Sequence, residues 1–339
     1  MTAIVIDPRY TEHDTGPGHP ERPARLTALL ELTEHLDRGF TTIAARPASG
    51  DELSLVHDPA YVEDVARTQH RDWYAFDADT PTCSRSYDTA RLAAGGLLAL
   101  IDAIMSGETA NGFAFVRPPG HHAERQRAMG FCLFNNVAVG AAYLRARYGL
   151  ERVLVVDWDL HHGNGTQHMF EREPGVLYVS THQYPYYPGT GAADEVGRGD
   201  GTGFTLNVPL PAGCGDPEYI DAFERLVVPV AEHYQPQFIL LSAGFDAHAR
   251  DPLGGMQVTE HGFRVMSRMM LDVARGCSEG RCAAILEGGY DLQAIRVSAA
   301  AVLDELRGNE VPLTRHLEPS RATPLVDQLI ELQKSYWSL

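Results

Sequence analysis

The sequence predicts an α/β fold in which helices cover both faces of a mostly parallel central sheet. Short apolar segments that resemble strands alternate along the chain with longer helical patterns, as in repeated strand–helix units. Several of these strands are almost wholly apolar, which is typical of strands covered on both faces. The 339 residues are 44% hydrophobic and 22% charged, a composition that fits a globular chain with a sizeable core.

Seven segments are expected to form strands, because each is short and rich in apolar and β-branched residues. In chain order they are residues 3–6, 112–116, 152–157, 176–180, 204–208, 238–243 and 283–286. The helices expected between them are residues 23–35, 87–106, 216–234 and 259–275, the last with Thr259 as its N-cap.

The remaining organisation is simple. We expect one domain over residues 1–339, with an amphipathic helix at about 322–336 docked on it. Residues 184–203 are rich in Gly, Pro and Tyr and are expected to form a long loop. A loop of that length in a compact protein is often functional.

Charge and composition limit the partners. The chain has 28 Lys and Arg against 45 Asp and Glu, a formal net charge of −17, so we expect no nucleic-acid partner. No apolar run is long enough to span a bilayer, and no membrane association is expected. The five cysteines form no C-x-x-C pair, which favours a reducing compartment, the cytoplasm.

Polar residues gather directly after predicted strands, where open parallel sheets place their functional sites. His121 and His122 follow the strand at 112–116 on a Gly-Pro loop and can point into one pocket, although such a pair is also common on surfaces. Asp157, Asp159 and His161 alternate at the end of the next predicted strand. In extended geometry these three side chains share a face.

A third segment adds Asp246 after the strand at 238–243. Two carboxylates and an imidazole, from Asp159, His161 and Asp246, with an open position, form the pattern of a catalytic zinc site. In the fourth segment Tyr290 follows two glycines and can project its hydroxyl over such a site, although alone it would be an ordinary loop tyrosine.

With these motifs, the chain resembles the histone deacetylase superfamily, and within it the class II and bacterial deacetylase-like amidohydrolases. The resemblance runs from G-H-P-E-R-P (18–23) through R-P-P-G-H-H-A (117–123), D-W-D-L-H-H-G-N-G-T-Q (157–167) and S-A-G-F-D (242–246) to E-G-G-Y (287–290), in the family's order. It implies the arginase/deacetylase α/β fold and one Zn²⁺ per chain.

The resemblance also implies a role for each residue around the metal. His122 matches the general base, and His121, backed by Asp157, matches its companion. Asn164 stands where some relatives have Asp, and a neutral amide leaves His122 more readily neutral. Tyr290 would donate a hydrogen bond to the oxyanion of the tetrahedral intermediate.

Substrate contacts follow from the same resemblance. Phe131 and Tyr187 would line a tunnel around the acyl-lysine methylenes, and the Gly130 carbonyl would face the leaving amine. Leu253 holds the gatekeeper position, and Asp79 falls near a residue that contacts the substrate backbone. Potassium is expected at a first site with Asp157, Ser180 and Thr181, and at a second with backbone carbonyls of Phe170, Glu173, Val176 and Phe204.

The expected activity is removal of acyl groups from ε-acyl-lysine of a protein or peptide, or from a small acylated amine. An acetylpolyamine amidohydrolase is the alternative, although apolar Leu253 cannot pair with a distal ammonium group. An arginase-like enzyme with two Mn²⁺ ions would need more bridging carboxylates, and a non-enzymatic acyl-lysine reader would need to have lost a ligand, the base or the tyrosine. The loop at 184–203 could also meet another subunit of a homo-oligomer.

Overall fold

Eight strands form a single sheet in the part of the chain that the structure describes, residues 1–36, 39–309 and 320–339. In this computed structural model the strand order is β2-β1-β5-β10-β9-β6-β7-β8, and all neighbouring pairs are parallel. The predicted parallel sheet is therefore confirmed. The strands are β1 (Thr2–Ile6), β2 (Phe40–Thr42), β5 (Asn111–Phe115), β6 (Val153–Asp157), β7 (Val176–Gln183), β8 (Thr205–Leu210), β9 (Phe238–Ala243) and β10 (Cys282–Leu286).

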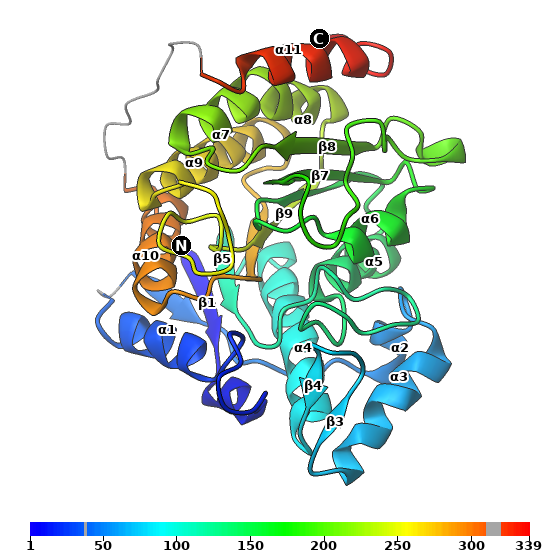
Figure 1. Cartoon of the computed structure of the whole chain (residues 1–339), viewed down its shortest axis with the longest axis vertical. Coiled ribbons are helices and arrows are strands. Elements are labelled where there is room, and N and C mark those ends of the chain that lie inside the picture. Colours follow the sequence, from blue (N-terminus) through cyan, green and yellow to red (C-terminus); the bar gives the residue numbers. More distant parts are fainter. Residues whose placement is uncertain (37–38, 310–319) are drawn as a thin grey trace.

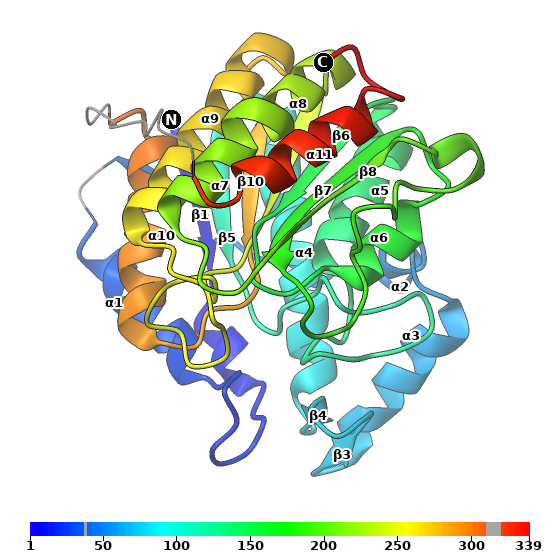
Figure 2. The same cartoon turned by 45° about the horizontal axis from the view of Figure 1, so that its top comes forward.

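Helices cover both faces of this sheet (Figures 1 and 2). One layer contains α1 (Ala24–Glu34), α7 (Asp216–Ala222), α8 (Val228–Tyr234), α9 (Glu260–Cys277) and α10 (Leu292–Leu306), with α11 (Thr323–Gln333) packed on α7. The other contains α4 (Ser86–Met105), α5 (Asn136–Tyr148) and α6 (Asn164–Phe170), beside α2 (Gly50–Leu53) and α3 (Pro59–Ala66). A short antiparallel pair, β3 (Tyr74–Ala75) and β4 (Pro81–Thr82), lies apart from the sheet. None of the described helices combines the length and apolar character needed to cross a membrane.

The central strands are buried along their whole length. In β6, β9 and β10 every residue is buried, including Asp157 at the end of β6. Helices on both sides leave no solvent-facing side to these strands, which explains why their sequences do not alternate between apolar and polar residues.

Several predicted elements differ from the structure in detail. The helix expected at 216–234 is divided into α7, a π-helical turn (Phe223–Val227) and α8. Pro229 has no N–H and its ring displaces the carbonyl of the preceding turn, so a regular α-helix cannot run through it. Strand β7 runs to Gln183, beyond the predicted end at residue 180. The N-cap prediction is confirmed, because Thr259 accepts a hydrogen bond from the backbone N–H of His261 at 3.2 Å.

Candidate functional site

The candidate site lies at the carboxyl ends of four neighbouring strands, β5, β10, β9 and β6. The polar segments at 117–123, 159–161, 246–248 and 287–290 each follow one of these strands. Because the strands are parallel and adjacent, their carboxyl ends meet at one edge of the sheet. The four segments therefore come together although they are far apart in the sequence.

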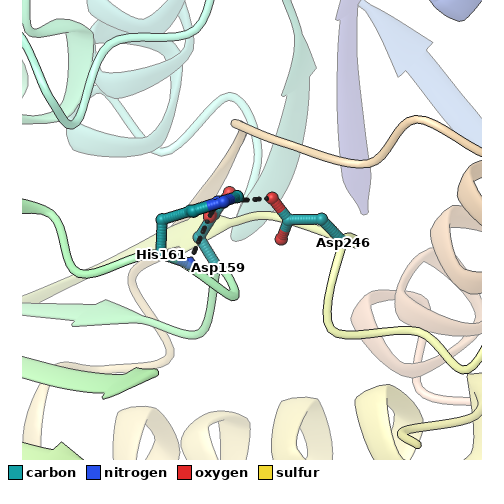
Figure 3. Close-up of side chains that lie close together, drawn as sticks. All are labelled: Asp159, His161 and Asp246. Atoms are coloured by element: carbon teal, nitrogen blue, oxygen red, sulfur yellow. Dashed lines mark hydrogen bonds and ion pairs between the residues drawn. The ribbon is translucent and has the colours of Figure 1, made fainter. Parts of the chain in front are cut away.

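Asp159, His161 and Asp246 form a compact cluster at this edge (Figure 3). One potential ligand atom from each residue lies within 4.8 Å of the others, and all three residues are buried. The Nδ1 atom of His161 lies 3.2 Å from Asp159 Oδ1 and 3.1 Å from Asp246 Oδ2. Two carboxylate oxygens and one imidazole nitrogen thus converge on a shared position, as the sequence predicts.

Backbone groups orient the two carboxylates. Asp159 Oδ2 accepts the N–H of Gly288 at 2.8 Å, and Asp246 Oδ1 accepts the N–H of Leu160 at 2.7 Å. A Cβ atom at Gly288 would lie 2.2 Å from Asp246 Oδ2, and one at Gly244 would lie 2.0 Å from Asp159 Oδ2. Glycine is therefore required at both positions for the carboxylates to approach the backbone so closely.

The cluster has the chemistry of a site for a divalent cation. Burial, together with the neighbouring carboxylate of Asp159, raises the pKa of Asp246 to about 7. Two buried carboxylates repel each other unless a cation lies between them. Oxygen and imidazole nitrogen are donors that Zn²⁺ accepts, and three protein ligands leave a coordination position open. The residues therefore fit a zinc ion.

Two adjacent histidines beside the cluster have opposite environments. The His121 and His122 rings lie 4.0 Å apart between centroids. His121 Nδ1 is 3.0 Å from Asp157 Oδ2. Burial opposes a charge on this ring, but Asp159 and Asp157 outweigh it and raise the pKa of His121 to about 10. Burial and the nearby rings of His121 and His161 hold the pKa of His122 well below its usual value.

The orientation of Asn164 fixes the tautomer of His122. The Asn164 amide nitrogen donates to Glu124 Oε1 at 2.5 Å and to the His122 carbonyl at 3.3 Å, so its Oδ1 faces the ring. His122 Nδ1 must donate to that oxygen, at 2.8 Å, which leaves Nε2 able to accept a proton. Sequence reasoning missed Glu124, although it follows the two histidines by only two residues.

Tyr290 is 8% exposed and lies between Phe131 and a buried arginine. Its ring meets the Phe131 ring edge to face at 5.8 Å, and the guanidinium of Arg25 lies 4.9 Å from its centroid. Arg25 also donates to the Gly289 carbonyl at 2.6 Å. Sequence reasoning missed Arg25, although it lies just beyond the motif at 18–23.

The predicted substrate-binding residues fall into two groups. Tyr187 and Gly130 lie against His122: the Tyr187 ring lies 5.1 Å from that of His122, and a Cβ at Gly130 would clash with the His122 ring. Phe131, the residue after Gly130, packs its ring against Tyr290 instead. Leu253 and Asp79 are placed by contacts with residues other than the two histidines. The Leu253 carbonyl accepts the Tyr186 hydroxyl, and the Asp79 carbonyl contacts His19 Nε2 at 3.1 Å.

The residues predicted to bind potassium lie in or beside β6, β7 and β8, and at and just after the end of α6. Asp157 and Ser180 are register partners in β6 and β7, and Thr181 Oγ1 is buried without a hydrogen-bond partner in the described structure. The carbonyls of Phe170, Glu173 and Phe204 accept backbone N–H groups of Glu173, Val176 and Tyr178. Potassium at either place remains a prediction.

Comparison with known proteins supports the resemblance. A sequence model described as "Histone deacetylase domain" matches residues 19–306. Histone deacetylase 15 of Arabidopsis thaliana is 42% identical over 99% of this chain, and Polyamine deacetylase HDAC10 of Homo sapiens is 43% identical over 86%. Histone deacetylase-like amidohydrolase of Pseudomonas aeruginosa is 41% identical over 86% of this chain and 77% of its own length. The chain spans 62% of the Arabidopsis protein and 45% of the human protein.

A solved structure has the same fold. "Crystal Structure of HDA15 HD domain" aligns with a TM-score of 0.93 and 42% sequence identity. The alignment covers 99% of this chain and 95% of the solved chain. The agreement therefore extends over almost the whole chain.

Proposed function

The chain belongs to the histone deacetylase family, and on this premise we propose that it is a zinc-dependent amidohydrolase that removes acetyl or other acyl groups from ε-acyl-lysine or a similar amide. The observation that carries the proposal is the buried cluster of Asp159, His161 and Asp246, with His122 and Tyr290 beside it. A reader of acyl-lysine would need no such arrangement.

Asp159, His161 and Asp246 would hold one zinc ion per chain. When bound, the ion would polarise the acyl carbonyl and lower the pKa of water at the open position. The protein's own contribution is to present the three ligands already oriented. The hydrogen bonds from Gly288 and Leu160 supply that orientation.

His122 acts as the general base. Its Nδ1 is committed to Asn164, so Nε2 takes a proton from the attacking water and later returns it to the leaving amine. The low pKa of His122 keeps the ring neutral and ready to accept. His121, paired with Asp157, stays protonated and stabilises negative charge by its position.

Tyr290 donates a hydrogen bond to the oxyanion formed from the acyl carbonyl. Phe131 and Tyr187 flank the acyl-lysine methylenes and exclude water, and the Gly130 carbonyl accepts an N–H of the leaving amine. Leu253 and Asp79 contact the substrate outside this tunnel. These roles rest on the placement of the side chains around His122 and on the family resemblance.

An acetylated polyamine is the alternative substrate. The net charge of −17 and the 43% identity to Polyamine deacetylase HDAC10 favour it. Against it, Leu253 offers no carboxylate to a distal ammonium group. We therefore place an acyl-lysine peptide or protein first.

Potassium and the cellular setting complete the proposal. K⁺ at the Asp157–Ser180 position would hold β6 and β7 in the register that places the zinc ligands. We expect the protein to act in the cytoplasm, without nucleic acid or membrane, and the loop at 184–203 to shape the tunnel mouth in any homo-oligomer.

A turnover panel tests the proposal. Purified protein is given acetyl-, longer acyl- and trifluoroacetyl-lysine peptides beside acetylated polyamines, with chelation and zinc re-addition as controls. We expect peptide turnover that chelation abolishes and zinc restores. His122→Ala and Tyr290→Phe should each lower kcat at least about 100-fold with zinc content unchanged, whereas the exposed His233→Ala should behave as wild type. Near-wild-type rates in either site variant would refute its assigned role.

A further inference from the structure

Asp251 is a buried carboxylate that the mechanism above does not use. It is 6% exposed and lies five residues after Asp246, in the loop that leads to Leu253. Its Oδ2 accepts the backbone N–H of Tyr290 at 2.6 Å and that of Asp291 at 3.2 Å. Its Oδ1 accepts the N–H of Leu253 at 3.0 Å. One side chain thus joins two loops through three backbone groups.

These hydrogen bonds hold the backbone that carries Tyr290. Asp251 binds this segment on the amide side, and Arg25 binds the preceding Gly289 carbonyl at 2.6 Å. Hydrogen bonds to an ionised carboxylate are shorter and stronger than neutral ones. Because the backbone sets the direction of the Cα–Cβ bond, fixing it at residues 289–291 also fixes where the Tyr290 hydroxyl can reach.

Capping of the following helix does not account for Asp251. Helix α10 already has its own N-cap, Asp291, whose Oδ1 accepts the N–H groups of Gln293 and Ala294. Asp251 instead binds the two residues immediately before the helix. Asp251 therefore binds Tyr290 and the N-cap residue Asp291, and does not itself cap the first turn of α10.

The same carboxylate connects Tyr290 with the outer part of the site. Leu253, held by Asp251 Oδ1, accepts the hydroxyl of Tyr186 on its carbonyl at 2.9 Å. The Tyr186 ring in turn stacks on His161 at 5.7 Å. A continuous series of contacts therefore runs from the partly exposed Tyr186 through Leu253 and Asp251 to Tyr290.

We propose that Asp251 is a positioning residue that aims the Tyr290 hydroxyl and ties its placement to the loop carrying Leu253. The inference rests on the proposed function, because it requires that Tyr290 bind the reacting carbonyl. Asp251 touches neither substrate nor zinc in this proposal. Its effect should therefore appear in kcat and should depend on the Tyr290 hydroxyl.

A double-mutant cycle tests this dependence. Asp251→Asn keeps the size of the side chain but replaces one acceptor oxygen by an N–H₂ group that faces backbone donors. We expect kcat for acetyl-lysine peptide to fall about 10- to 100-fold, as a small misplacement of a catalytic group does, with zinc content unchanged. In the Tyr290→Phe background the same substitution should change kcat by less than about twofold.

A matched control separates positioning from general damage. Asp216 also tethers a loop, accepting the Thr259 N–H at 2.7 Å and the Thr259 hydroxyl at 2.6 Å. Asp216→Asn should leave kcat within about twofold of wild type. Trifluoroacetyl-lysine, whose oxyanion needs less stabilisation, should lose less rate than acetyl-lysine in Asp251→Asn.

The outcomes distinguish this inference from the proposed function. If wild type turns over no acyl substrate with zinc, both fail. If wild type is active but Asp251→Asn lowers kcat equally with Tyr or Phe at position 290, or not at all, the positioning role is wrong. Should Asp251→Asn not fold, Tyr186→Phe at a 41% exposed residue replaces it: a loss of kcat that vanishes in the Tyr290→Phe background supports the coupling, and any other result contradicts it.

Discussion

Two buried charged clusters of this protein differ in how their charges are balanced. In one, the Glu21 carboxylate binds Arg25 at 2.9 Å and Arg117 at 2.5 Å, and all three side chains are fully buried. The guanidiniums also donate to carbonyls, including those of Gly289 and Tyr10. In the other, the imidazole of His161 lies between the carboxylates of Asp159 and Asp246, and His121 Nε2 lies 3.7 Å from Asp159 Oδ1.

The contrast shows how a structural charge cluster differs from a functional one. Burial alone would raise the pKa of Glu21, but Arg117 and Arg25 outweigh it and lower that pKa to about 2. Burial raises the pKa of Asp246 instead, since its neighbour is another carboxylate. The Glu21 cluster is balanced by permanent guanidinium charges, whereas the Asp159–His161–Asp246 cluster is balanced by a titratable imidazole, since burial is outweighed by the two carboxylates, which raise the pKa of His161 to about 9. A divalent cation between these side chains would take over that balancing role.

The largest effect is expected when the Asp159–His161–Asp246 cluster loses a carboxylate. Asp246→Ala should lose its zinc, and turnover should fall by about three to four orders of magnitude, since the ion supplies several kcal/mol to the reaction. Metal analysis of the purified variant and kcat measurements check this. Asp216→Ala, which removes a carboxylate outside the ligand set, should keep its zinc. Full zinc occupancy in Asp246→Ala would remove this residue from the ligand set.

Replacing Glu21, the carboxylate of the first cluster, should lower the stability of the fold. Glu21→Gln leaves two buried guanidiniums without a counter-charge, so we expect a loss of about 3–5 kcal/mol in the free energy of unfolding. Urea titrations of the zinc-free proteins measure it. Glu63→Gln, which weakens an exposed ion pair with Arg67, should change little. Equal stability of Glu21→Gln and wild type would show that the arginines are not held by this charge.

Glu124 allows a test of how the His122 tautomer is set, because Glu124 acts on His122 through the neutral amide of Asn164. Glu124→Ala frees the Asn164 amide to turn, which would present N–H₂ to His122 and disfavour the working tautomer. We expect kcat/KM to fall about tenfold, the value of one strong hydrogen bond. Glu124→Gln keeps an acceptor oxygen and should retain most activity. If Glu124→Ala and Glu124→Gln lowered kcat/KM equally, this role of Glu124 would be wrong.

The last effect depends on pH and concerns a buried group with no charge to balance. Burial lowers the pKa of His57 to about 4, and its Nε2 accepts the Asn135 N–H at 2.8 Å. Below pH about 6.5 the unfolded chain binds a proton at this ring that the folded chain does not, so stability falls between pH 6.5 and 4 by up to about 1.4 kcal/mol per pH unit. Urea unfolding against pH should show a shallower decline for His57→Gln. If the free energy of unfolding fell equally steeply with falling pH in His57→Gln and wild type, the lowered pKa of His57 would be contradicted.

The sequence predicts those features that depend on short-range pattern and on strand ends. The strands that place Asp159, Asp246 and Tyr290 are continuous apolar runs, and parallel strands bring their carboxyl ends to one edge. Pro229 accounts for the break at the π-helical turn. Helices α5 and α10, which were not predicted, pack against other helices, and local pattern does not specify such packing.

The supporting residues could not be predicted in the same way. Asp251, Arg25 and Glu124 act through contacts with residues distant in the sequence, such as the Arg25–Gly289 hydrogen bond across 264 positions. No spacing rule connects such partners. Their carboxylate and guanidinium groups resemble ordinary surface charges until the fold buries them.

The order of strands also makes metal supply a determinant of stability. His161 and Asp246 are 85 positions apart along the chain, yet β6 and β9 are neighbours in the sheet. A site that uses ligands from both segments can form only after the segments have come together. A zinc ion therefore binds the folded chain and not the unfolded one. By mass action, free zinc at a hundred times its dissociation constant would add about 2.7 kcal/mol to folding, and melting temperatures would rise and fall with the metal available.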